Sequence, residues 1–247
     1  MRIYALIPAR YQSTRFPGKP LAKIAGKPMI QHVYERATSC PEVSEVIVAT
    51  DDERISASIK AFGGKAVMTD PAHRSGTDRI YEAAVKMNVG REDLVVNIQG
   101  DQPLFHPSTV SRLVEPLSDD QSIPMTTLKW KIPDERDLEN PNHVKVVTDK
   151  KGFALYFSRY PVPFFRNEKA KQLHYKHLGF YGFRMDFLLQ FTRLSEGALE
   201  AAEKLEQLRA LEHGFKIKVQ ETPFNSIEVD VPEDVKKVEE ILKGQTI

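Results

Sequence analysis

The chain has 247 residues, of which 41% are hydrophobic, and its 35 basic residues nearly balance its 34 acidic residues. That length is enough to bury a full core, and the near-neutral charge argues against a general nucleic-acid-binding protein. The single cysteine, Cys40, excludes an internal disulfide and fits a reducing cytoplasm. Apolar runs stay well short of the roughly 20 residues of a membrane helix, so we expect neither a targeting segment nor membrane insertion.

The first hundred residues alternate short apolar runs with stretches in which apolar residues recur at helical spacing. Strands are predicted over 3–7, 46–49, 65–68 and 94–98, and helices over 29–37, 55–62 and 80–87. The strands are apolar almost throughout, which is typical of parallel sheets buried on both faces. The pattern therefore predicts a doubly wound α/β half.

After Pro107 the alternation changes. A helix is predicted over 108–117, followed by strands over 125–130, 144–148, 154–158 and 179–184 without a full helix between each pair. Some of these strands should therefore pair antiparallel. The proline-rich segment 160–166 predicts a non-helical connector into a loop that reaches about Leu173. Helices over 185–194, 199–213 and 232–242 and a strand over 216–220 complete the prediction.

The loop after the first strand carries three cations, Arg10, Arg15 and Lys19. It leaves the carboxyl end of a strand, where open α/β sheets bind ligands. Three prolines restrict this loop, and Gly18 would let its backbone approach a phosphate. An ordinary solvated loop is the alternative, because Lys and Arg usually face water. The glycine patterns of P-loops and dinucleotide sites are absent from this sequence, so a different phosphate-binding loop is predicted.

Residues 7–21 begin Ile-Pro-Ala-Arg and end Ser-Thr-Arg-Phe-Pro-Gly-Lys-Pro-Leu. This stretch resembles the signature loop of the 3-deoxy-manno-octulosonate (Kdo) cytidylyltransferases and, more loosely, that of the CMP-sialic acid synthetases. Further motifs extend the resemblance in the family's order to about Leu242. The resemblance implies a mixed, mainly parallel, nucleotide-diphospho-sugar transferase-like sheet with a smaller sugar-binding and dimerisation portion.

The resemblance also implies an organisation for the chain. We expect a single domain over 1–247, with a nucleotide-binding half to about residue 120. An acceptor-sugar and dimer portion is expected over 121–225, and a metal-ligand strand with a C-terminal helix over 226–247.

A second motif, Arg74–Arg79, reads as a polar turn that opens a helix. Helix starts bind anions, although Ser75, Thr77 and Asp78 would also serve as simple capping residues. In the family this segment binds nucleotide. The resemblance thus assigns CTP contacts to Arg10, Arg15, Lys19, Arg74, Ser75, Gly76, Thr77, Asp78, Arg79, Asn97 and Gln99.

Two acids are candidates for holding Mg²⁺, which takes oxygen ligands. Asp101 follows an apolar strand, although an acid after glycine can simply be a turn residue. Asp230 resembles the family's second metal ligand, with helix capping as its alternative role. The resemblance implies that both acids bind Mg²⁺ and that Lys19 and Arg15 complete the catalytic set. His174 and His177 fall short of a structural zinc site.

The acceptor site should recognise a carboxylate and several hydroxyls. Arg159 could pair bidentately with the sugar carboxylate, and strand alternation places His177 and Tyr181 on one side. The resemblance adds Glu206 and Gln207, on the helix predicted over 199–213, and it also adds Asn225.

The expected reaction is in-line attack of the anomeric hydroxyl of Kdo on the α-phosphorus of CTP. It releases pyrophosphate and gives CMP-Kdo for lipopolysaccharide synthesis. The expected partners are CTP, Kdo and a second copy of the chain, without nucleic acid. A CMP-sialic acid synthetase or related sugar nucleotidyltransferase is the alternative enzyme, and a nucleotide-sensing protein without turnover is the alternative class. The presence of both Asp101 and Asp230 argues against the latter.

Overall fold

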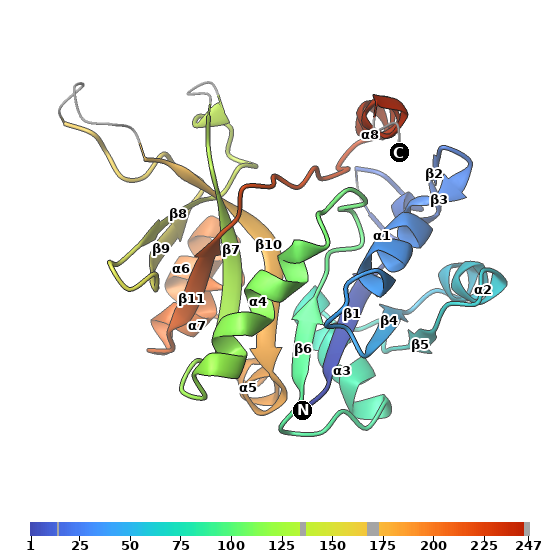
Figure 1. Ribbon diagram of the computed structural model, residues 1–247, viewed down its shortest axis with the longest axis horizontal. Coiled ribbons are helices and arrows are strands. Elements are labelled where there is room, and N and C mark those ends of the chain that lie inside the picture. Colours follow the sequence, from blue (N-terminus) through green and yellow to red (C-terminus); the bar gives the residue numbers. More distant parts are fainter. Residues whose placement is uncertain (14, 134–136, 167–172, 245–247) are drawn as a thin grey trace. The chain divides into compact units, whose positions relative to one another are not determined.

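The computed structural model describes residues 1–13, 15–133, 137–166 and 173–244. The chain divides into two compact units (Figure 1). The first unit is formed by Met1–Ser111 together with Ser226–Ile247, and the second unit is Arg112–Asn225. The division predicted near residues 120 and 225 assigns functions to parts of the chain. The compact units do not test those functions, so it stays a prediction.

The first unit contains a parallel sheet in the strand order β6-β1-β4-β5 (Figure 1). Its strands are β1 (Ile3–Ala9), β4 (Glu45–Thr50), β5 (Ala66–Met68) and β6 (Leu94–Asn97), connected by α1 (Met29–Thr38), α2 (Glu53–Ala61) and α3 (Gly76–Lys86). Residues of β4 and β6, and most of β1, are buried on both faces of the sheet. Continuous burial of this kind requires cover on both sides. The predicted doubly wound α/β arrangement is confirmed.

The order of these strands locates a crevice. The chain runs outward through β1, β4 and β5, then returns to place β6 on the other side of β1. The carboxyl ends of β1 and β6 therefore form a topological switch point, where such sheets bind ligands. The loop after β6 lies tight against β1, since a Cβ at Gly100 would lie 2.8 Å from the carbonyl oxygen of Pro8.

The C-terminal segment belongs to the same unit through a small core of its own. Helix α8 (Pro232–Gly244) lies beside the hairpin of β2 (Lys23–Ile24) and β3 (Lys27–Pro28), which follows the short helix η1 (Lys19–Leu21). Ile24, Met29, Val229 and Val238 form a buried cluster there. This cluster fixes the segment 226–231, which carries the second predicted metal ligand.

The second unit contains a mixed sheet. Its strands are β7 (Met125–Lys131), β8 (Lys145–Thr148), β9 (Ala154–Ser158), β10 (Tyr175–Arg184) and β11 (Ile217–Glu221). The β10–β7, β10–β8 and β8–β9 pairs are antiparallel, whereas β11 and β7 are parallel. Helix α4 (Ser108–Asp119) leads into this unit, and α5 (Met185–Phe191) follows β10. The antiparallel pairing predicted after Pro107 is confirmed.

Two predicted elements of this unit are corrected. The single helix predicted over 199–213 is wrong, because the chain forms α6 (Ala198–Glu203) and α7 (Leu208–Glu212). Lys204 ends α6 in the left-handed region with φ of 53°. Strand β10 begins at Tyr175 rather than Gly179, with a bulge between Leu178 and Tyr181. Most of the predicted loop that reaches Leu173 falls on 167–172, outside the described residues.

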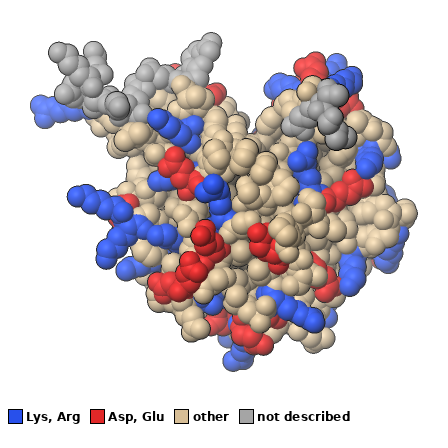
Figure 2. Space-filling view, in the orientation of Figure 1, with Lys and Arg blue, Asp and Glu red and all other residues tan. Residues whose placement is uncertain are grey.

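Within the part of the chain that is described, no helix is both long and apolar enough to cross a membrane. On the face in view, acidic and basic side chains are interspersed (Figure 2). That face therefore lacks the continuous basic surface typical of a nucleic-acid-binding protein.

Candidate active site

A pocket of about 520 Å³ opens at the switch point of the first unit. Its walls come from the loop after β1, the start of α3 and the loop after β6. The side chains that line it include four cations, Arg10, Arg15, Lys19 and Arg74, and a single acid, Asp101. An excess of cations in a concave site attracts polyanions such as a triphosphate.

The backbone of the cationic loop turns at Gly18, whose φ is 71°. The Gly18 N–H donates to the Tyr11 carbonyl oxygen at 2.8 Å, which closes the loop on itself. A Cβ at Gly18 would lie 3.1 Å from the Tyr11 ring. Close packing against Tyr11 therefore also favours glycine here, and the approach of this backbone to a phosphate stays a prediction. The turn delivers Lys19 to the start of η1.

The two predicted metal ligands converge on Lys19. Its Nζ lies 2.6 Å from Asp101 Oδ2 and 3.8 Å from Asp230 Oδ1. Arg15 donates to both carboxylate oxygens of Asp230, at 2.9 and 3.3 Å. Two acids far apart in the sequence thus face one point beside the cationic loop.

Asp230 is brought to Asp101 by its neighbours. The Val229 N–H donates to the Asp101 carbonyl oxygen at 2.9 Å, and Val229 itself is buried in the C-terminal cluster. A buried hydrogen bond of 3.1 Å from Ser226 Oγ to Gln102 Oε1 joins the same two segments. The relative position of the two acids is therefore set by the core and does not depend on a flexible end.

Asp234, and not Asp230, accepts the backbone hydrogen bonds at the start of α8. The backbone N–H groups of Asp230 and Val231 donate to Asp234 Oδ2 at 3.0 and 3.2 Å. This leaves the Asp230 carboxylate directed at Arg15 and Lys19.

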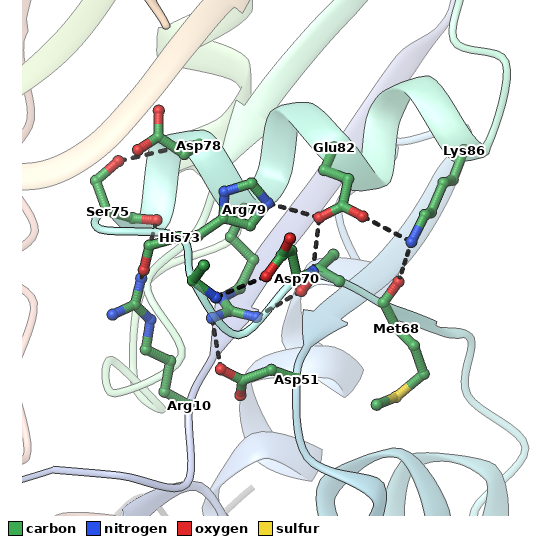
Figure 3. Close-up of polar contacts among 12 residues, drawn as sticks. Arg10, Asp51, Met68, Asp70, His73, Ser75, Asp78, Arg79, Glu82 and Lys86 are labelled. Atoms are coloured by element: carbon green, nitrogen blue, oxygen red, sulfur yellow. Dashed lines mark hydrogen bonds and ion pairs between the residues drawn. The ribbon is translucent and has the colours of Figure 1, made fainter.

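The segment before α3 has a capping role and also forms a pocket wall. Ser75 Oγ accepts the Asp78 N–H at 3.0 Å, so the predicted cap is present. Arg74 and Gly76 line the pocket. Arg10 donates to the carbonyl oxygens of His73 and Ser75, the second at 3.3 Å, which fixes its guanidinium against this segment (Figure 3).

Of the other predicted nucleotide contacts, Arg79, Thr77 and Asn97 do not line the pocket. Arg79 is fully buried and donates to Asp51 Oδ2 at 2.7 Å and to Thr69 (Figure 3). Its burial lowers the pKa of its guanidinium from the usual value, although the negative charge of Asp51 opposes that effect. Thr77 and Asn97 are also buried, whereas Gln99 lines the pocket. Arg79 thus stabilises the interior of the first unit.

Four predicted acceptor residues lie in the second unit near the bulge of β10 and the break between α6 and α7. The His177 and Tyr181 ring centroids are 5.5 Å apart, and His177 Nε2 lies 2.8 Å from Thr127 Oγ1. Burial lowers the pKa of His177 to about 3. Burial, and then the negative charge of Glu206, raises the pKa of Tyr181 well above its usual value. The Gln207 Nε2 is buried without a hydrogen-bond partner among the described residues.

Arg159 directly follows β9, as predicted, and its contact with a sugar carboxylate stays a prediction. Its guanidinium donates to the carbonyl oxygens of Glu203, Pro141 and Lys204 at 2.7, 2.9 and 3.3 Å. These bonds use three of the five N–H groups of the side chain. Asn225, the remaining predicted contact, is the last residue of the second unit.

Sequence reasoning missed two further residues that hold the segment carrying Arg74. Glu82 on α3 lies 2.5 Å from Nε2 of His73, and His73 directly precedes Arg74 in the chain. The spacing of Glu82 and Lys86 predicts only a helical ion pair. A partner such as His73, on a segment without regular structure, has no such periodic signal.

The acid pair fits a hard divalent cation. Both carboxylates already face the ammonium of Lys19, which occupies a cation's position between them. Among the described residues no group of three His, Cys, Asp or Glu side chains could enclose a metal. Mg²⁺ typically binds through one or two protein carboxylates, with water and phosphate oxygens completing its shell. Asp101 and Asp230 therefore suit a metal that is shared with a bound nucleotide.

A cationic pocket at the switch point of a doubly wound sheet, with two converging acids, defines a nucleotide-binding α/β protein of the phosphoryl-transfer class. The family model described as cytidylyltransferase matches residues 4–218. The 3-deoxy-manno-octulosonate cytidylyltransferase of Geotalea uraniireducens is 54% identical, covering 98% of this chain and 100% of its own length. That of Desulfatibacillum aliphaticivorans is 53% identical over 99% and 100%.

Solved structures of cytidylyltransferases are also similar to this chain. A CMP:2-keto-3-deoxy-manno-octonic acid synthetase complexed with CTP superposes with a TM-score of 0.93 at 43% identity, covering 99% of this chain and 100% of that one. A cytidylyltransferase from Leptospira borgpetersenii, 17% identical with a TM-score of 0.64 over 100% and 89%, shares the fold. The chain belongs to the cytidylyltransferase family, and the resemblance to the Kdo cytidylyltransferases is confirmed.

Proposed function

We propose that this chain transfers CMP from CTP to the anomeric hydroxyl of Kdo, giving CMP-Kdo for lipopolysaccharide synthesis and releasing pyrophosphate. The observation that carries the proposal is the convergence of Asp101 and Asp230 on Lys19 beside a pocket lined by four cations. The names of the relatives favour Kdo over sialic acid as the acceptor. Each functional role below belongs to this proposal.

The triphosphate of CTP binds in the cationic pocket. Arg10 and Arg74 approach it from the side of α3, and Arg15 and Lys19 from the loop after β1. The Arg15–Asp230 pair is half exposed on the arginine side, and such pairs contribute about 1 kcal/mol or less. Phosphate oxygens can therefore replace the acids as partners of these cations. Lys19 and Arg15 then offset negative charge on the departing pyrophosphate.

Asp101 and Asp230 hold Mg²⁺. When bound, the ion supplies positive charge at the α-phosphate, where negative charge grows during transfer. The Val229–Asp101 backbone hydrogen bond keeps the two acids together before the ion arrives. Reactions of this class depend mainly on positioning and charge neutralisation, so a nucleophilic side chain is not required.

The second unit binds the acceptor. His177 stays neutral and Tyr181 stays protonated at neutral pH, as their pKa shifts require. Together with Glu206 and Gln207 they offer donors and acceptors to a sugar with several hydroxyls. The buried Nε2 of Gln207 gains a partner when such a hydroxyl binds. Recognition of the Kdo carboxylate by Arg159, and a hydroxyl contact by Asn225, are retained as proposals.

A homodimer and a cytoplasmic location are part of the same proposal. Large apolar side chains of the second unit are exposed, with Tyr160 at 77% and Phe164 at 87% of their full exposure. Exposed apolar residues in one region are typical of subunit contacts. The lone Cys40, buried as a free thiol, fits a reducing compartment.

The test is substitution of each acid in turn. We expect Asp101→Asn and Asp230→Asn to lower kcat by ~10²-fold or more, because transition-state charge loses its counter-ion. The matched control is Glu45→Gln, which removes an ion pair to Lys65 with the same 2.6 Å separation as Lys19–Asp101. Pyrophosphate release is measured with CTP and other nucleoside triphosphates against Kdo, sialic acid and related acidic sugars.

Full turnover by Asp101→Asn would contradict the metal assignment. Faster turnover with sialic acid than with Kdo would instead support the alternative acceptor. Calorimetric CTP binding by the unsubstituted protein, without product after long incubation, would identify a nucleotide sensor.

A further inference from the structure

The segment 70–75 connects β5 to α3 and carries Arg74 into the pocket. It lacks regular structure, yet one side chain of α3 holds it at two points. Glu82 Oε2 accepts the Asp70 N–H at 2.8 Å and lies 2.5 Å from His73 Nε2 (Figure 3). The other carboxylate oxygen pairs with Lys86 Nζ at 2.6 Å.

The same segment is the support of Arg10. The guanidinium of Arg10 donates to the carbonyl oxygens of His73 and Ser75 and also lines the pocket (Figure 3). Ser75 is itself fixed because its Oγ caps α3. A continuous set of contacts therefore runs from Glu82 through His73 to Arg10, and along the backbone to Arg74.

Glu82 is ionised throughout the neutral range. Burial alone would raise its pKa, but hydrogen bonds from Lys86, the Asp70 N–H and His73 lower the pKa to about 2. Hydrogen bonds to an ionised carboxylate are roughly twice as strong as those between neutral groups. These hydrogen bonds order the segment 70–75 before a nucleotide binds. Without them, binding would have to order the backbone of this segment, which costs free energy.

We propose that Glu82 is a positioning residue for CTP, which fixes the segment 70–75 and thereby directs Arg10 and Arg74 at the triphosphate. This inference rests on the proposed function, because it requires that the pocket binds CTP. Glu82 does not line the pocket itself, so its effect on the nucleotide passes through His73 and the backbone.

The positioning role predicts a selective kinetic change. Cations that grip the triphosphate equally in the ground state and the transition state affect KM without affecting kcat. Glu82→Ala should therefore weaken CTP binding and raise the KM for CTP by about tenfold, the order expected for a disordered charge-assisted phosphate contact. The KM for Kdo and kcat should change by less than about twofold. Glu82→Gln keeps one acceptor oxygen and should recover part of the loss.

The control is Glu45→Ala. Glu45 pairs with Lys65 at 2.6 Å and its side chain is 23% exposed, close to the 24% of Glu82, but it does not touch the segment 70–75. CTP dissociation constants come from titration calorimetry, both KM values and kcat from pyrophosphate release, and folding from thermal unfolding of each variant.

Unchanged CTP affinity in folded Glu82→Ala would overturn the inference. An equal loss in every kinetic parameter, shared with Glu45→Ala, would also overturn it, because that result indicates only reduced stability. If Glu82→Ala does not fold, His73→Phe decides, since it removes the contact to Glu82 but keeps the carbonyl oxygen used by Arg10. That variant should bind CTP several-fold more weakly, and wild-type affinity would reject the role. Failure of the unsubstituted protein to bind CTP would refute the proposed function instead.

Discussion

The environment of His177 makes it a hydrogen-bonding residue and not a proton carrier near neutral pH. Its ring packs edge-on against Phe157 at a centroid distance of 4.9 Å, and its Nε2 lies 2.8 Å from Thr127 Oγ1. Burial, and then the positive charge of Lys176, lowers its pKa to about 3. A neutral imidazole keeps one ring nitrogen as donor and the other as acceptor.

The pKa of His177 predicts how stability depends on pH. An unfolded histidine has a pKa near 6.5, so between pH 6.5 and 3 the unfolded state binds more protons than the folded state. The stabilisation is complete above pH 6.5 and is lost as the pH falls toward 3. His177→Gln should reduce the slope of unfolding free energy against pH by up to ~1.4 kcal/mol per pH unit in this window. Urea unfolding of both proteins from pH 7.5 to 4.5 measures it, and identical slopes would contradict the prediction.

At the residue scale, local sequence patterns predict which side chains lie near the pocket. They do not predict which of these side chains pair with one another and which turn into the core. Asp101 is predictable because an apolar strand ends just before it. The approach of Asp230 depends on Val229 and the distant core cluster, which no local pattern encodes. Arg79 belongs to the same short motif as Arg74, yet its pairing with Asp51 turns it inward. The different positions of these two arginines depend on a tertiary contact, which the short motif does not encode.

At the element scale, the start of α8 bears directly on the acid pair. Asp234 accepts the backbone N–H groups of Asp230 and Val231, as the third helical residue does in a capping box. Burial would raise the pKa of Asp234, but hydrogen bonds from Lys237 and those backbone groups lower it. The helix start therefore also holds the backbone of Asp230.

Removal of this cap should affect both stability and catalysis. Asp234→Ala is expected to lower the free energy of unfolding by about 1 kcal/mol. Turnover should fall further than this loss of stability explains, because the Asp230 backbone is released. Asp234→Asn keeps a side-chain oxygen and should retain most of both properties. Urea unfolding and kcat for the two variants provide the test, and equal behaviour of Ala and Asn would contradict it.

At the element scale, strands and helices with clear periodicity were predictable, and the failures have tertiary causes. The apolar spacing over 199–213 fits one helix, but Arg159 bonds the carbonyl oxygens of Glu203 and Lys204, which a continuous helix would use internally. The start of β10 was missed because its first residues include the buried polar pair Lys176 and His177. The hairpin of β2 and β3 is too short to show alternation.

At the scale of the whole molecule, the first unit is assembled from both ends of the chain. Its four pocket cations and both converging acids come from segments distant in sequence. One buried cluster packs the segments around Lys19, Asp101 and Asp230 together. The predicted acceptor residues belong to the other unit. This division separates the effects of the two substrates, because a ligand that binds only the folded state stabilises the structure it contacts.

CTP with Mg²⁺ should therefore protect backbone amides chiefly in the first unit. Hydrogen exchange is expected to slow over 10–20, 70–76, 98–103 and 226–231, with a stabilisation of ~2.7 kcal/mol when CTP is present at one hundred times its dissociation constant. Chelation of the metal should remove protection at 226–231 first, because that segment reaches the nucleotide only through Asp230. Strand β10 around His177 should respond to Kdo and not to CTP alone. Protection of β10 by CTP alone would show that the nucleotide is bound by residues other than those that line the cationic pocket.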